Sequence, residues 1–217
     1  MGVEGYISPP VSDKGDEGGC ILRQPPFLEE ERMRLRRKPW IDEAIREYDS
    51  FVYLQPQEDL KGRWREVFDN PTAPLWVELG TGKGNFISRL ADIHREVNFI
   101  GIEVQLGVLY YAAKKCAAAE LTNVRLLRFD AAFLETLFAP GEVDRFFINF
   151  CDPWPKKRHA KRRLTYRGFL DRYARLLAAD GEIHFKSDNA GLFDFTLEEF
   201  NARHWPLSEV TYDLHGS

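Results

Sequence analysis

Apolar and polar residues follow two alternating patterns along most of the chain. Short apolar runs at residues 75–79, 98–102, 124–129, 145–150 and 182–186 are typical of buried parallel strands. The segments between and after them carry apolar residues at helical spacing, at 85–95, 105–120, 164–177 and 190–203. Strand and helix in regular alternation predict an α/β fold with a doubly wound sheet and right-handed crossovers.

The amino-terminal third has a different character. Residues 1–27 are rich in Gly, Pro, Ser and Asp, which predicts a disordered tail. Residues 28–70 predict a basic extension with two short helices. The apolar residues at helical spacing in this extension are Trp40, Ile41, Ala44, Ile45, Tyr48, Leu60, Trp64, Val67 and Phe68. Residues 71–217 then form the sheet domain.

Charge is segregated along this chain of 217 residues. There are 30 Lys and Arg against 34 Asp and Glu, a formal net charge of −4. A protein that is acidic overall binds nucleic acid only through local positive patches, and two such clusters are present. The one near the amino terminus comprises Arg32, Arg34, Arg36, Arg37 and Lys38.

The cysteine pattern and the hydropathy argue against a disulfide-rich, metal-binding, secreted or membrane-spanning protein. Cys20, Cys116 and Cys151 are widely spaced, which favours neither a disulfide framework nor a metal site. The histidines are scattered, so no metal is expected. No apolar run approaches membrane-spanning length, and the amino terminus has no signal-peptide core. A cytoplasmic enzyme without a membrane segment is the expectation.

The first strand of the sheet domain leads into the glycine-rich loop E-L-G-T-G-K-G-N-F. Three glycines at alternate positions allow a sharp turn and close approach of a ligand: Gly80, Gly82 and Gly84. A dinucleotide motif would need glycine at Asn85, and a P-loop would need glycine at Val77. The remaining pattern, E-x-G-x-G-x-G, is typical of S-adenosylmethionine-dependent methyltransferases with a Rossmann-like sheet.

Four acidic residues stand at or just after successive strand ends: Glu78, Glu103, Asp130 and Asp152. Ligands of open α/β sheets bind at this edge, so the four carboxylates are expected to share one rim. Glu103 is placed to hold the ribose hydroxyls, and Asp130, followed by Ala131, suits the adenine amino group. Each one alone is better explained as a cap or turn residue, but four successive strand ends with an acid beside a glycine loop are hard to explain in that way.

The most informative stretch, N-F-C-D-P-W-P-K-K-R-H-A-K-R-R, follows the fourth strand. Two prolines around Trp154 stiffen the loop and hold Asp152 in place. The cationic run after them favours an anion, and a carboxylate beside it indicates chemistry on a nucleic-acid base. A solvated basic loop with a structural Asp-Pro turn is the alternative. Trp154 is expected to pack within the protein, with stacking on an extruded base as the second possibility.

From about residue 32 to 217 the sequence resembles the bacterial tRNA (guanine-N7-)-methyltransferase family. These single-subunit enzymes methylate a variable-loop guanosine (position 46) of tRNA. The matching blocks are R-L-R-R-K, E-L-G-T-G-K-G-N-F, I-G-I-E, D-A-x-x-L, F-C-D-P-W-P-K-K-R-H-A-K-R-R-L-T and F-K-S-D-N-x-x-L-F. The D-P-W-P-K block is specific, and with K-S-D-N nearby it is close to diagnostic.

The resemblance implies roles for individual residues. S-adenosylmethionine would be held by Glu78, Gly80, Gly82, Gly84, Glu103, Asp130, Ala131 and Asp152, with Asp152 also the catalytic residue. The tRNA would be contacted by Lys156, Arg158, His159, Lys161, Arg162, Arg163 and Asp188. For Asp188, a cap at the start of the following helix is the competing interpretation, with Asn189 as rival for that position. Either a monomer or a homodimer is compatible with the sequence.

Two departures from the family pattern stand out. Cys151 takes a position where many members have serine, and a small buried residue is tolerated there. Members usually continue past a segment like Tyr212–His215 into a last strand and a T-x-Y-E-like motif, whereas this sequence ends at Ser217. A class I methyltransferase sheet without its last strand is therefore expected.

Two alternatives to a tRNA methyltransferase stay open on the sequence. One is a methyltransferase acting on a small molecule or a protein, which would share the cofactor half but not the basic loop. The other is a non-catalytic RNA-binding protein or an inactive, truncated methyltransferase.

Overall fold

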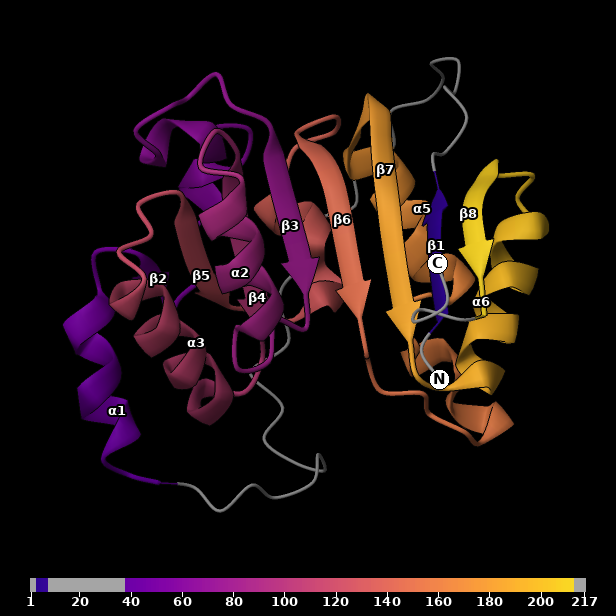
Figure 1. Ribbon diagram of the computed structural model, residues 1–217, viewed down its shortest axis with the longest axis horizontal. Helices are drawn as coiled ribbons and strands as arrows, with labels where there is room; N and C mark the ends of the chain where they lie inside the picture. Colours follow the sequence, from indigo (N-terminus) through magenta and orange to yellow (C-terminus); the bar gives the residue numbers. More distant parts are fainter. Residues whose placement is uncertain (1–2, 8–37, 213–217) are drawn as a thin grey trace.

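The computed structural model describes residues 3–7 and 38–212, and its centre is one eight-stranded sheet (Figure 1). The strand order is β2-β5-β4-β3-β6-β7-β1-β8. The strands are β1 Val3–Ile7, β2 Val52–Tyr53, β3 Leu75–Leu79, β4 Asn98–Glu103, β5 Val124–Arg128, β6 Val143–Asn149, β7 Leu177–Ser187 and β8 Leu207–Thr211. All pairings from β2 across to β7 are parallel, which confirms the doubly wound α/β prediction.

Helices cover both faces of this sheet. The α-helices are α1 Ile41–Ala44, α2 Asn85–Ile93, α3 Leu106–Ala118, α4 Leu134–Leu137, α5 Arg167–Leu176 and α6 Ala190–Asn201. The 3-10 helices are η1 Ile45–Tyr48, η2 Glu58–Leu60, η3 Trp64–Val67, η4 Ala131–Phe133 and η5 Lys157–Arg162. All five predicted strands and all four predicted helices of the sheet domain are present, with shifted ends. The largest shift is in β7, which starts at Leu177 rather than residue 182.

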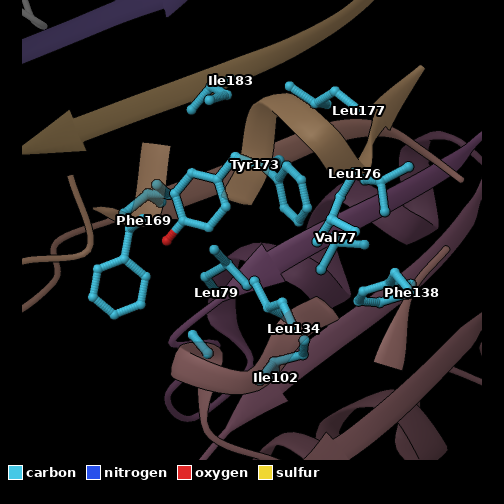
Figure 2. Close-up of a cluster of buried hydrophobic side chains, with 14 of the residues drawn as sticks. Val77, Leu79, Ile102, Leu134, Phe138, Phe169, Tyr173, Leu176, Leu177 and Ile183 are labelled. Carbon is cyan, nitrogen blue, oxygen red and sulfur yellow. The ribbon is translucent and has the colours of Figure 1, made fainter. Parts of the chain in front are cut away.

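Two hydrophobic clusters hold the layers together. On one face, Val77 and Leu79 of β3 and Ile183 of β7 pack against α5, where Tyr173 is fully buried (Figure 2). The Tyr173 hydroxyl donates to the carbonyl oxygen of Leu164 at 3.0 Å, so its polar end is satisfied. The other cluster fills the opposite face beneath α2 and α3. Burial on both faces explains why the strands appear in the sequence as nearly continuous apolar runs.

The amino-terminal strand corrects the expectation of a disordered tail over residues 1–27. Val3–Ile7 form β1, inserted between β7 and β8 and antiparallel to both. Val3 lies opposite Ser187 and Ile7 opposite Ile183. An internal position in a sheet pairs backbone groups on both sides, so a short segment can be ordered without a strongly apolar sequence. Residues 8–27, Cys20 and the basic cluster 32–37 lie outside the described residues.

Residues 38–70 pack into the sheet domain. β2 pairs with β5. Trp64 is fully buried, and its indole Nε1 donates to the carbonyl oxygen of Leu137 at 2.8 Å. Ile41 and Ile45 are buried beside α3. In the parts of the chain that the structure describes, no helix has the length and apolar character needed to cross a membrane.

Candidate functional site

A cavity of about 220 Å³ opens at the carboxyl ends of the parallel strands, the edge to which β3, β6 and β7 point in Figure 1. Its walls come from the ends of β3, β4, β5 and β6 and from the loop after β6. They are lined by Gly80, Ile102, Glu103, Val104, Gln105, Phe129, Asp130, Ala131, Phe150, Cys151, Asp152, Trp154, Arg162 and Leu164. Three of the four predicted rim acids therefore meet at one cavity, as expected for an open α/β sheet.

The glycine loop contributes one glycine to the wall and uses another for packing. Gly80 has φ +75°, and a Cβ placed there would meet no atom within 4 Å, so its backbone is open to a ligand. Gly84 has φ +74°, and a Cβ there would lie 2.8 Å from Ala112 of α3. Gly84 is thus required for the contact of the loop with α3, whereas Gly80 faces the cavity.

Glu78 lies beneath the loop rather than in the cavity wall. It is 4% exposed, and Thr81 donates its hydroxyl to Oε2 at 2.7 Å. Asn149 at the end of β6 approaches Oε1 at 3.4 Å. Burial raises the pKa of Glu78 to about 7, partly offset by the hydrogen bonds from Thr81 and Asn149, with the Glu103 charge adding to the rise. Its position makes Glu78 a support of the glycine loop.

Glu103 connects the glycine loop to the next helix. Its Oε2 accepts from the backbone N–H of Gly82 at 3.1 Å, and its Oε1 accepts from that of Gln105 at 2.9 Å. Each carboxylate oxygen keeps acceptor capacity for a ligand, because a carboxylate oxygen accepts more than one hydrogen bond. Glu103 therefore shapes the cavity as well as lining it.

Asp130 caps a helix and also lines the cavity. One oxygen caps η4 by accepting from the N–H of Ala132 at 2.9 Å. The residue is exposed and lines the cavity, so its other oxygen is available to a ligand. Ala131 is buried in the same wall, beside the apolar side chain of Phe129. An apolar slot with a carboxylate at its edge suits a flat heterocycle with an amino group.

The loop after β6 supplies a further part of the cavity wall. Asp152 is exposed and lines the cavity. Phe150, predicted as the last residue of a buried strand, lies outside β6 and is 58% exposed. Phe150 and Trp154 have φ values of +51° and +41°, a region that costs a bulky residue about 1–3 kcal/mol. Burial raises the pKa of the Cys151 thiol to about 12, with the Asp152 charge adding to it.

Trp154 packs within its own loop. The Arg162 guanidinium lies 4.9 Å from the Trp154 ring centroid, and the His159 ring meets it edge-on at 5.8 Å. The packing interpretation is thus supported, although the contacts come from the basic loop and not from the core. The pKa of His159 lies below its ordinary value through desolvation, together with the charges of Arg158, Arg162 and Lys156.

The basic run divides into outward and inward residues. The side chains exposed to solvent are those of Lys156, Lys157, Arg158, Lys161 and Arg162. Arg163 instead points inward: it donates to the carbonyl oxygens of Pro153 and Trp154 at 3.0 and 3.1 Å and stacks on Phe195 at 4.3 Å. Its guanidinium therefore braces the loop, and the prediction of Arg163 as an RNA contact stays a prediction.

Asp188 is exposed just after β7 and does not line the cavity. The helix cap is Asn189, whose Oδ1 accepts from the N–H of Leu192 at 2.8 Å, so the rival interpretation of Asp188 as the cap is excluded. The backbone N–H of Phe150 donates to the carbonyl oxygen of Lys186 at 2.9 Å, which brings the ends of β6 and β7 together. Asp188, two residues beyond Lys186, therefore lies near the loop that follows β6.

Comparison with known proteins agrees with this arrangement. Residues 72–210 match a family model described as "Putative methyltransferase". The chain is 50% identical over 185 residues to a tRNA (guanine-N(7)-)-methyltransferase of Geobacillus thermodenitrificans (strain NG80-2), covering 85% of each chain. A protein of the same name from Streptococcus pyogenes serotype M6 is 48% identical over 185 residues, covering 85% of this chain and 87% of the relative.

The chain belongs to the tRNA (guanine-N(7)-)-methyltransferase family. A solved structure described as "Structure of an antibiotic related Methyltransferase" is 23% identical with a TM-score of 0.44, covering 61% of this chain and 63% of the other.

A second basic surface in this tRNA (guanine-N(7)-)-methyltransferase family member was not predicted as a whole. Lys38 donates its ammonium to the Tyr111 hydroxyl at 3.1 Å, and the Lys83 ammonium lies 5.9 Å from the Tyr111 ring centroid. The pKa of Tyr111 is lowered by the hydrogen bond from Lys38 and by the charges of Lys38, Lys83 and Lys114. Only Lys38 belonged to a predicted basic cluster. Lys83 and Lys114 are distant from it in the sequence and come near it only in the folded chain.

Among residues 3–7 and 38–212, no group of three or more His, Cys, Asp or Glu side chains could hold a metal ion. The cavity residues that the sequence did not single out are apolar or neutral: Ile102, Val104, Gln105, Phe129, Phe150 and Leu164. Their only signal is that each lies within two positions of a predicted acidic or basic residue.

Proposed function

We propose that this protein transfers the methyl group of S-adenosylmethionine to N7 of a variable-loop guanosine of tRNA, at position 46. The observation that carries the proposal is the meeting of Glu103 and Asp130 with Asp152 around one cavity, bordered by Arg162 of the basic loop. The family membership and the name of the relatives at about 50% identity support the same activity.

The donor set of the cavity fits S-adenosylmethionine. Glu103 supplies acceptors for ribose hydroxyls, and Asp130 with the Phe129–Ala131 wall supplies an acceptor and an apolar slot for adenine. The open backbone of Gly80 allows close approach of the amino-acid part. A cavity lined by three carboxylates and one guanidinium also suits a ligand that carries a sulfonium charge. When bound, that cofactor supplies an electrophilic methyl group.

The chain's own contribution is alignment and electrostatics. Guanine N7 is neutral and has a free lone pair, so its attack on the methyl group needs no general base. Positioning of the two reactants therefore accounts for much of the acceleration of methyl transfer. Methylation leaves a positive charge on the purine, which the exposed carboxylate of Asp152 is placed to stabilise. Asp152 is also suited to accept hydrogen bonds from guanine N1–H and the N2 amino group. Asp188 is the second candidate for that recognition.

Binding of tRNA is supported by two basic surfaces. The loop after β6 presents the outward set Lys156, Lys157, Arg158, Lys161 and Arg162. Lys38, Lys83 and Lys114 gather around Tyr111 of α3. Helices α1 and α3 lie at the β2 side of the sheet (Figure 1). A ligand that engages both surfaces must be a large polyanion, and contacts to its phosphates position it without reading sequence. Such a substrate is consistent with a cytoplasmic location.

The decisive experiment incubates the protein with S-adenosylmethionine labelled in the methyl group and unmodified tRNA transcripts. The expected result is one N7-methylguanosine per tRNA, lost when the target guanosine is replaced by adenosine. Cofactor binding measured by calorimetry is a separate readout. Cofactor binding without methylation would favour a different acceptor, and tRNA binding without cofactor binding would favour a non-catalytic RNA-binding protein.

A further inference from the structure

Phe150 stands out among the apolar side chains at the surface. Five large hydrophobic residues are exposed in the described part of the chain: Trp40, Ile93, Phe150, Val210 and Tyr212. Of these, Phe150 alone lines the cavity. With 58% of its surface exposed, its ring contributes little to the core, so packing does not account for an aromatic residue there.

The backbone of Phe150 is held in an unfavourable conformation. Its φ is +51°, in the left-handed region that bulky residues rarely adopt. The hydrogen bond from its N–H to the carbonyl oxygen of Lys186 continues the β6–β7 pairing, in which Asn149 lies opposite Lys186. The sheet therefore fixes a conformation that turns the ring out at the rim. Strain of this kind, imposed by surrounding structure, concentrates at ligand-binding positions.

We propose that the Phe150 ring is the stacking surface of the acceptor-base subsite, against which the flat face of the target purine lies. The inference rests on the proposed function and assigns the residue that holds the base. Phe150 is two residues from Asp152, and both line the same cavity as Gly80, Glu103 and Asp130. A ring for the face of the base and a carboxylate for its edge are the two contacts that fix an extruded base.

The other aromatic residue of this wall is less available. Trp154 already has the Arg162 guanidinium 4.9 Å from its ring centroid and the His159 ring against its edge at 5.8 Å. Among the described residues, no aromatic ring and no cation lies against the Phe150 ring. The exposed ring is therefore free to contact a base without displacing another side chain. Stacking does not discriminate between bases, so selection of guanine stays with the hydrogen-bonding groups.

The test compares Phe150→Gly with Phe150→Tyr and a matched control. Glycine removes the ring and relieves the left-handed backbone, whereas tyrosine keeps the ring. Glu120 is exposed with the same φ of +51° and lies at the end of α3, so Glu120→Gly relieves equal strain away from the cavity. The measurements are kcat and KM with tRNA, cofactor affinity by calorimetry, and the unfolding temperature.

The expected result is that Phe150→Gly lowers kcat/KM for tRNA about tenfold or more, the scale of base–aromatic stacking. Cofactor affinity and unfolding temperature should not fall. Phe150→Tyr should retain kcat/KM within about twofold, and Glu120→Gly should leave it unchanged.

Other outcomes overturn the proposal. Normal kcat/KM in Phe150→Gly would exclude stacking, and a joint loss of stability or cofactor affinity would make Phe150 a support of the loop. If the unaltered protein does not methylate tRNA in the same assay, the fault lies with the proposed function, and the base subsite falls with it.

Discussion

Arg163 is bound to the loop that carries Trp154: its Nη2 donates to the Trp154 carbonyl oxygen at 3.1 Å, and its Nε donates to that of Pro153 at 3.0 Å. The same guanidinium stacks on Phe195 of α6. Arg162, the preceding residue, lies over the outer side of Trp154 and is exposed. Two adjacent arginines thus have different tasks, one bracing the loop and one available to a phosphate.

Alanine at these two positions should therefore have separable effects. Arg162→Ala should weaken tRNA binding and flatten the slope of log affinity against log salt by somewhat under one unit, as expected for one lost phosphate contact. Arg163→Ala should instead lower the unfolding temperature, because charge-assisted hydrogen bonds to two carbonyls are lost, at about 1–3 kcal/mol. Filter binding across salt concentrations and thermal unfolding measure the two quantities. If the slope of log affinity against log salt flattened more in Arg163→Ala than in Arg162→Ala, Arg163 and not Arg162 would be the phosphate contact.

The distinction between these arginines shows what the sequence leaves undetermined. Charge can be counted along the chain, but the direction of a side chain depends on which carbonyl groups the fold brings near it. Phe150 illustrates the same limit. An apolar residue at the end of a strand pattern is predicted to be buried, but β6 ends at Asn149 and the chain turns before Phe150. The acids of the rim were predictable because the carboxyl ends of parallel strands must meet at one edge.

The amino-terminal strand marks the other limit. Val3–Ile7 pair with β7, which lies more than 170 positions away along the chain. Local composition carries no information about such a pairing, and Val3–Ile7 forms no continuous apolar run because Glu4 and Gly5 interrupt it. The central strands were predictable because they are buried on both faces, so they appear as nearly continuous apolar runs.

The place of β1 in the sheet can be tested at Gly5, which lies opposite Phe185 of β7. Gly5→Pro removes a backbone donor from a strand with neighbours on both sides, where proline is not tolerated. We expect a loss of about 1–3 kcal/mol of stability in chemical unfolding, the cost of an unsatisfied buried partner. Gly5→Ala keeps the N–H and is the control. Equal stability of both variants and the unaltered protein would place β1 outside the folded sheet.

Asp152→Ala should abolish methylation of tRNA with little loss of stability. The carboxylate is exposed at the cavity and packs in neither hydrophobic cluster, so its removal leaves the core intact. Asp152→Asn separates its two proposed roles, since the amide keeps an acceptor but not the charge. Turnover with tRNA and the unfolding temperature are measured together, and near-normal turnover in Asp152→Ala would remove Asp152 from the mechanism.

Glu103→Ala should weaken S-adenosylmethionine binding by about 1–3 kcal/mol, the cost of hydrogen bonds lost to a charged group. The loss has two sources, because the side chain also holds the N–H groups of Gly82 and Gln105. Glu103→Gln keeps one acceptor oxygen. Its cofactor affinity, measured by calorimetry, should lie between those of the unaltered protein and Glu103→Ala. Unchanged cofactor affinity in Glu103→Ala would rule out the ribose contact.

Glu78 should make stability depend on pH in a way that one substitution removes. Its pKa is raised from 4.5 to about 7 by burial, so between these values the folded protein binds more protons at this site than the unfolded chain. Its contribution to stability is therefore favourable at low pH and is lost as the pH rises from about 4.5 to about 7. The full change is about 3 kcal/mol.

Glu78→Gln keeps the size of the side chain and an acceptor for the Thr81 hydroxyl but cannot ionise. Without added cofactor, the stability of the variant relative to the unaltered protein should grow across that interval and stay constant above it. Chemical unfolding at a series of pH values from 4.5 to 8 measures the difference. A difference that is flat across the interval would mean that Glu78 ionises at its ordinary pKa, and that the charge beneath the glycine loop is already stabilised by Thr81 and Asn149.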